Sequence, residues 1–112
     1  MYKNFVEEIL DGLAECESVS SVCRGWPKSF EKLPCVAVSE AANSTAAFIG
    51  DKPYINIAEY YVRIFTEKAT EGDRAAVEVD ETMRKLGFTL TFAYEDDNPD
   101  IRQKIMRYEK SY

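Results

Sequence analysis

The stretch from Pro53 to Tyr94 limits the possible folds most, because it carries signals for a strand, a helix and a second strand in succession. Its first thirteen residues, PYINIAEYYVRIF, are rich in β-branched and aromatic side chains, which predicts a strand over Pro53–Phe65. Its last seven residues, FTLTFAY, alternate between large apolar and small or polar side chains. This alternation predicts a half-buried strand with one apolar face formed by Phe88, Leu90, Phe92 and Tyr94.

The segment between these strands predicts a helix from Glu71 to Leu86. Thr70 is a suitable N-cap, and Gly87 can adopt the left-handed conformation that ends a helix in a Schellman motif. Apolar side chains recur at helical spacing and define the face that should be buried: Ala75, Ala76, Val79, Met83 and Leu86. This helix is therefore expected to close the core of the domain.

The predicted strand Pro53–Phe65 is longer than the helix that should cover it. Thirteen residues at ~3.3 Å each span roughly 40 Å, whereas sixteen helical residues at ~1.5 Å each span roughly 24 Å. The strand is therefore expected to extend beyond its cover or to bend at a bulge. Its excess length is either surface left for a neighbouring subunit or an ordinary strand end with amphipathic tyrosines at its rim.

The flanking segments complete an α+β pattern. An N-terminal helix capped by Asn4 is predicted from an apolar stripe formed by Tyr2, Phe5, Val6, Ile9, Leu10 and Leu13. Strands are predicted at Ser18–Gly25, at Cys35–Glu40 and, after an acidic turn, at Ile101–Tyr112. In the loop WPKSFEKLP, Trp26 and Phe30 are expected to fold back onto the core. We therefore expect a single α+β domain over residues 1–112, with a mainly antiparallel sheet of about five strands and two helices packed on it.

The segment AANSTAAFIGDK, residues 41–52, has small and polar residues that favour a loop or a hairpin. Phe48 and Ile49 nevertheless make its end apolar. Such a tip either contacts the body of the same domain or docks on a partner, since an exposed apolar patch often marks an interface.

Composition and charge argue against several classes of function. A net charge of −6 does not suit a free nucleic-acid binder or an anionic membrane surface, because both are recognised mainly by Lys and Arg. The apolar runs are much shorter than the ~20 residues that span a bilayer. The N-terminus has no signal-peptide core, so we expect a reducing cytoplasm. Cys16, Cys23 and Cys35 are odd in number and irregularly spaced, which predicts reduced and mostly buried thiols.

No motif in the sequence predicts catalysis. The chain has no histidine, no glycine-rich phosphate loop and no nucleophile–base pair, and its acidic residues are scattered. The acidic turn Glu95–Asp100 lacks the glycine and the distant glutamate of a calcium-binding EF-hand loop, so it is interpreted as a solvated hairpin tip. We therefore expect a protein that is not an enzyme and that needs no cofactor and no metal.

Several segments together resemble the tail-terminator and tail-completion (head–tail joining) proteins of phages and prophages. The resemblance covers nearly the whole chain and lies in LPCVAVSEAANS, the long strand YINIAEYYVRIFTE, the helix end MRKLGF and the final segment RQKIMRYEKSY. It implies a small α+β subunit that forms a ring, usually a hexamer, at the end of the tail tube. The implied partners are copies of the same chain, tail-tube proteins and head-connector proteins. The implied locations are the virion and, during assembly, the host cytoplasm.

Two groups of residues are candidates for the functional site of such a ring. The subunit or partner interface is predicted at the apolar tip and on the long strand: Phe48, Ile49, Tyr54, Ile55, Ile57 and Tyr61. A lumen-facing acidic turn is predicted at Glu95, Asp96, Asp97 and Asp100, where negative charge would let DNA pass without binding. The alternative interpretation is a small cytoplasmic α+β binding module or dimeric adaptor without catalysis, which could pair its sheets across the long strand.

Overall fold

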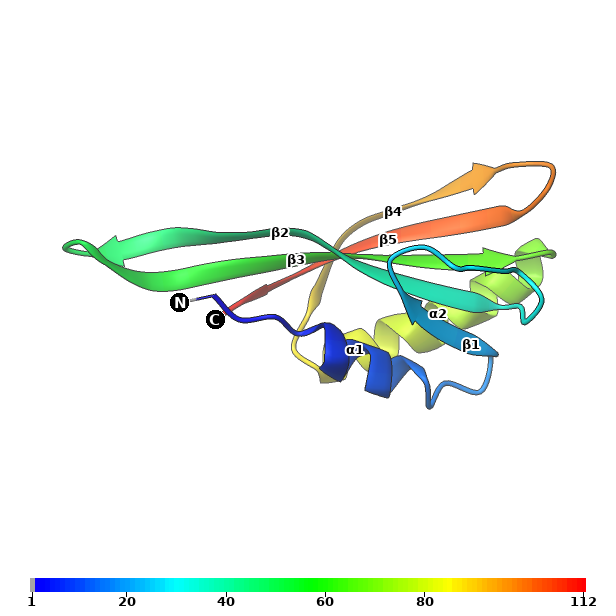
Figure 1. Ribbon diagram of the computed structural model, residues 1–112, viewed down its shortest axis with the longest axis horizontal. Helices are drawn as coiled ribbons and strands as arrows, with labels where there is room; N and C mark the ends of the chain where they lie inside the picture. Colours follow the sequence, from blue (N-terminus) through cyan, green and yellow to red (C-terminus); the bar gives the residue numbers. More distant parts are fainter. Residues whose placement is uncertain (1) are drawn as a thin grey trace.

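The computed structural model describes residues 2–112 and shows an α+β fold with a five-stranded, mostly antiparallel sheet. The elements follow in the order α1 (Val6–Leu13), β1 (Ser21–Arg24), β2 (Cys35–Ile49), β3 (Lys52–Thr66), α2 (Ala69–Lys85), β4 (Thr89–Asp97) and β5 (Arg102–Ser111). The strand order in the sheet is β1-β2-β3-β5-β4, and only β1 and β2 run parallel. Both helices lie on the same side of the sheet (Figure 1). The predicted fold class is confirmed.

The main core lies between the helices and one face of the sheet. It is formed by buried apolar residues of α1 and α2, by the alternate residues Tyr60, Val62 and Ile64 of β3, and by their neighbours on β2 and β5. The hydroxyl of Tyr60 accepts a hydrogen bond from the backbone N–H of Phe5 at 2.8 Å and is 3.1 Å from Asn4 Oδ1. The start of α1 is therefore fixed to the middle of β3, so the first helix closes the core as its apolar stripe predicts.

The two helix ends of α2 differ in how well they were predicted. At the C-terminus, Gly87 has a φ of 91°, and the N–H of Phe88 donates to Met83 O at 2.9 Å, as in a Schellman motif. At the N-terminus, the helix begins at Ala69, after an extended Lys68, so the prediction of Thr70 as the N-cap is wrong. The N–H of Gly72 donates to Lys68 O at 3.2 Å, so the first turn of the helix begins two residues earlier than expected.

Strand β2 is much longer than predicted. It runs without a break from Cys35 to Ile49, so residues 41–49 are a strand and not a loop, and the hairpin turn follows at Gly50. Small and polar residues form this strand because β3 supplies a pairing partner along its whole length. The pairing of β2 with β3 is irregular, with register shifts near Ala42 and Ala47. The sequence of residues 41–52 favoured a loop or a hairpin, and the structure shows a hairpin.

A register shift in β4 overturns the predicted apolar face of that strand. Leu90 pairs with Tyr108 on the core side, but the next pair is Phe92 with Arg107, so Thr91 is an extra residue. Phe92 and Tyr94 therefore project from the face opposite the helices and are exposed, whereas Phe88 is buried. The hydroxyl of Thr91 donates to Arg107 O at 3.0 Å, which gives this residue a partner on β5.

Three aromatic side chains lie outside the positions that the sequence pattern predicted. Tyr2 precedes α1 and is exposed, with its hydroxyl donating to Glu40 at 2.8 Å. Trp26 and Phe30 do fold back, but onto Phe65, on the sheet face away from the helices, with ring centroids 5.1 Å apart in both cases. Phe65 belongs to a small second cluster of apolar residues, with Cys35 and Ala37, and not to the main core.

Candidate assembly interface

The hairpin of β2 and β3 extends far beyond the helices that cover the rest of the sheet (Figure 1). The molecule measures 51 × 25 × 23 Å along its principal axes, and the hairpin accounts for its elongation. Pairing of β3 with β5 ends where Asn56 and Tyr112 exchange two backbone hydrogen bonds of 2.7 and 2.8 Å. Beyond that point β3 pairs only with β2. We call residues 44–55, which form this free end, the arm.

A polar network marks the base of the arm. The hydroxyl of Tyr112 donates to Asn43 Oδ1 at 2.6 Å, and Asn43 Nδ2 donates to Lys3 O at 2.9 Å. One step further along the hairpin, Thr45 Oγ1 donates to Asn56 Oδ1 at 3.0 Å. Both chain termini therefore hold the hairpin at Asn43 and Asn56, and the six residues of each strand beyond them reach roughly 20 Å at ~3.3 Å per residue.

The arm presents large apolar side chains to solvent. Phe48, Ile49 and Tyr54 are each at least 60% exposed, and Ile55 is 37% exposed. The only charged residues of the arm are Asp51 and Lys52, both near its tip. A two-stranded hairpin is marginally stable by itself, and exposed apolar patches on soluble proteins usually mark contact sites. These four predicted interface residues therefore all lie on the uncovered arm, which is suited to contact with another chain.

The other two predicted interface residues lie on the body of the domain. Ile57 is half-buried where β3 pairs with both β2 and β5. Tyr61 is half-buried on the sheet face away from the helices, with Arg63 at 5.1 Å and Arg107 at 5.4 Å from its ring centroid. The six residues are thus not one surface: four lie on the arm, Ile57 lies where β3 joins β2 and β5, and Tyr61 belongs to a patch that the sequence did not predict.

That patch combines arginine and aromatic side chains from four segments of the chain. Arg63 also lies 6.0 Å from the Trp26 ring, and Arg107 lies 5.8 Å from the Phe92 ring, with cation–π geometry in each case. We call it the arginine–aromatic face; its members are Trp26, Phe30, Tyr61, Arg63, Phe92, Tyr94 and Arg107. Trp, Tyr and Arg are the residue types most enriched at the energetic centres of protein interfaces.

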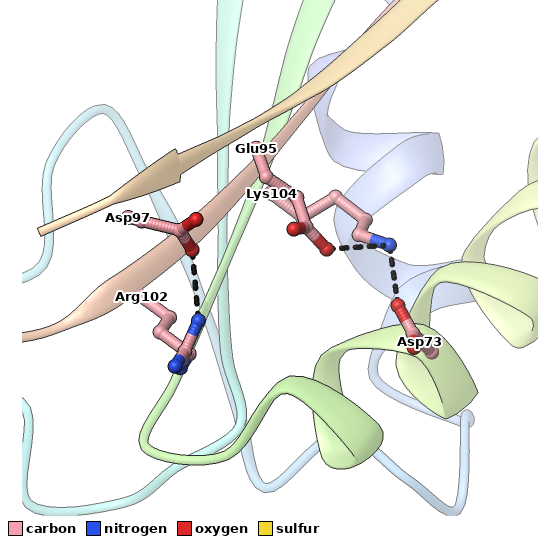
Figure 2. Close-up of polar contacts among 5 residues, drawn as sticks. All are labelled: Asp73, Glu95, Asp97, Arg102 and Lys104. Atoms are coloured by element: carbon pink, nitrogen blue, oxygen red, sulfur yellow. Dashed lines mark hydrogen bonds and ion pairs between the residues drawn. The ribbon is translucent and has the colours of Figure 1, made fainter.

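The acidic segment lies at the β4–β5 hairpin, but Glu95, Asp96 and Asp97 belong to strand β4, so the turn itself is shorter than predicted. Two of the carboxylates have partners within the same chain. Figure 2 shows Asp97 paired with Arg102 at 2.8 Å, and Lys104 placed between Glu95 at 3.3 Å and Asp73 of α2 at 2.6 Å. The carboxylates around Lys104, with Asp73 as the larger cause, raise the pKa of this lysine. Lys104 therefore ties the β4–β5 hairpin to the N-terminal part of α2.

Asp96 and Asp100 differ from these two residues. They are exposed, and no ion pair involves either of them within residues 2–112. Asp96 pairs with Gln103 on the strand ladder, so its side chain lies on the same face as Tyr94. Negative charge is consequently available at this end of the sheet, next to the exposed aromatic residues of β4.

A groove of about 370 Å³ lies between α1 and α2. Its polar groups hold the two segments together: Ser18 N donates to Glu78 Oε2 at 2.9 Å, and Cys16 Sγ lies 3.3 Å from Thr82 Oγ1. Across residues 2–112, no group of three or more His, Cys, Asp or Glu side chains could hold a metal ion. Nor is any described helix long and apolar enough to cross a membrane.

The three cysteines are free thiols, Cys35 buried and the other two half-buried. Burial, together with the neighbouring Cys35, raises the pKa of the Cys23 thiol. A raised pKa lowers the thiolate fraction and with it the reactivity of the sulfur. The prediction of reduced thiols therefore agrees with the structure, although burial is complete only for Cys35.

Comparison with known proteins shows a likeness of fold. No protein-family model matches the sequence, and no curated protein matches it. Among solved structures, the chain is similar to a chain of the virion of a native gene transfer agent particle, with a TM-score of 0.56 and 14% sequence identity. The alignment covers 89% of this chain and 81% of that chain. The shared fold therefore extends over nearly all of both chains.

Proposed function

We propose that this protein is a structural subunit of a phage-like particle, which forms a ring at the end of the tail tube and joins tail to head. The observation that carries the proposal is the arm, an uncovered apolar hairpin held at its base by both termini. Apolar side chains that stay in water do not stabilise a monomer, whereas a subunit of an assembly can bury them against another chain.

The likeness of fold supports the same proposal from another direction. The similar solved structure is a virion component, and it matches this chain over 89% of its length. The resemblance of the sequence to tail-terminator and tail-completion proteins points to the end of the tail rather than to another part of a particle. A structural role also fits the interior of the described chain, where polar groups hold elements together and form no constellation for catalysis.

The acidic turn has two possible places in such a ring. On the lumen, Glu95, Asp96, Asp97 and Asp100 would repel DNA phosphates and let DNA pass. Asp96 and Asp100 also lie at one lateral edge of the sheet, where they could meet a second subunit. Neutralising the four acids separates the two places: intact assembly with altered DNA passage supports the lumen, and weakened assembly supports the contact.

The arm can be tested with the double substitution Phe48→Ser/Ile49→Ser. Both side chains are exposed, so the monomer should keep its fold and thermal stability, but ring closure and capping of tail tubes should be lost. Electron microscopy of purified protein mixed with tail tubes would measure capped tube ends. Wild-type levels of capping by a folded double variant would contradict the proposal.

The matched control is Val77→Ser, which removes an exposed apolar side chain from α2, far from the arm. It should cap tubes as the wild-type protein does. A binding module that acts as a monomer or dimer would show neither rings nor caps at any concentration.

A further inference from the structure

The two lateral edges of the sheet carry opposite charge. One edge is β1, which carries Arg24 and no acid, and Lys32 lies beside it, because Ser21 Oγ donates to Lys32 O at 2.9 Å. The middle of the loop that follows β1 lies instead over Phe65 on the sheet face. The other edge is β4 with the acidic turn, where Glu95–Asp100 contains four acids and no base. We call these the basic edge and the acidic edge. Arg24 and Lys32 are exposed, and no ion pair involves them among residues 2–112.

The two edges also lie at the same height along the sheet. One row of paired residues crosses all five strands, from Asp96 through Gln103, Phe65 and Cys35 to Ser21. Ser21 is tied to Lys32 of the basic edge by the same hydrogen bond. A rotation about an axis roughly along the strands therefore brings the acidic edge of one copy to the basic edge of the next without a shift along the axis.

Both edges are also open in the isolated chain. β1 pairs only with β2, and β4 pairs only with β5, so each keeps one unpaired side. Natural proteins protect open strand edges with charged residues such as lysine, with proline or with a covering segment. Residues 89–94 of β4, TLTFAY, contain no charged residue and no proline. Exposed aromatic residues stand on the β4 edge, Phe92 and Tyr94.

We infer that the occupant of each edge is a second copy of this chain, with the acidic edge of one subunit against the basic edge of its neighbour. Contact between unlike surfaces is heterologous, and it closes into a ring when the rotation allows it. Opposite charge gives the contact its direction, because like edges repel each other. The inference rests on the proposed function for its setting in a ring, but its surfaces are distinct from the arm.

Charge reversal on each edge tests the contact. Variant A carries Arg24→Glu/Lys32→Glu, and variant B carries Asp96→Lys/Asp100→Lys; all four side chains are exposed, so both variants should fold. At low ionic strength, sedimentation should show self-association of the wild-type protein. Each variant alone should associate at least tenfold more weakly, and an equimolar mixture of A and B should recover association, since every contact in an alternating oligomer again joins opposite charges.

The control variant Arg84→Glu/Lys85→Glu changes the charge by the same amount as variant A, but in the last turn of α2, where both side chains are exposed. It should associate as the wild-type protein does. Three results would overturn the contact: self-association of A and B at the wild-type level, no recovery in a mixture of the folded variants, or a wild-type chain that stays monomeric at low salt and high concentration.

The outcomes also separate this inference from the proposed function. If A and B each assemble and cap tail tubes like the wild-type protein, the edge contact is wrong and the ring function stands. If the mixture recovers association but no form of the protein caps tail tubes, the edge contact stands and the tail function is wrong.

Discussion

The two ends of the β2–β3 hairpin show that the same pair of strands can be fully packed at one end and exposed to solvent at the other. Near Val36 and Ile64, the strands are covered by both helices and flanked by other strands, and these side chains are fully buried. Near Ile49 and Tyr54, the strands have only each other, and their side chains are in water. The body therefore supplies the stability of the fold, and the arm is available for the proposed assembly contact.

The largest expected difference between the two ends is in stability. Ile64→Ala removes a fully buried side chain from the body and should lower the free energy of unfolding by about 2–5 kcal/mol. Ile49→Ala, the same substitution on the arm, should change it by less than about 0.5 kcal/mol because the side chain is exposed. Urea denaturation of the two variants measures both values. Equal losses would mean that the arm is part of the cooperative core.

A smaller difference is expected at alkaline pH. Burial, with a hydrogen bond to Asp80 as the second cause, raises the pKa of Tyr108 above its ordinary value of 10.0. The unfolded chain then releases this proton at a lower pH than the folded chain does. The stabilising contribution is complete below about pH 10 and is lost as the pH rises further.

Tyr108→Phe removes the titrating hydroxyl and should reduce the loss of stability above pH 10, although it also deletes the hydrogen bond to Asp80. Tyr54→Phe on the arm is the matched control and should keep the wild-type loss, because Tyr54 is exposed in the folded chain. Denaturation midpoints of both variants, followed from pH 8 to pH 11, test this prediction. An identical alkaline decline in the Tyr108→Phe variant would contradict the burial argument.

Local signals in the sequence were sufficient for much of the fold. The apolar stripes placed both helices, Gly87 placed the end of α2, and the excess length of the predicted strand anticipated an overhang. Two features depended on pairing between strands, which no local pattern records. β2 extends to Ile49 because β3 pairs with it, and the extra residue Thr91 moves Phe92 and Tyr94 to the other face.

The candidate site was predictable to a similar degree. An apolar tip at Phe48 and Ile49 was visible in the sequence, because large apolar residues stood beside a turn signal at Gly50. The arginine–aromatic face was not visible, since Trp26, Arg63 and Arg107 come from three segments that only the sheet brings together. The opposite charges of the two edges required the strand order β1-β2-β3-β5-β4, which the sequence did not fix.

Amide hydrogen exchange of the arm, in the free protein and in rings on tail tubes, tests the central claim most directly. In the free protein, amides of residues 44–55 should exchange about a hundredfold faster than those of residues 58–65, because only one neighbouring strand protects them. On the tube, the arm amides should become protected to the level of the body. An arm that is already protected in the free protein, or one that stays unprotected in the ring, would contradict the account.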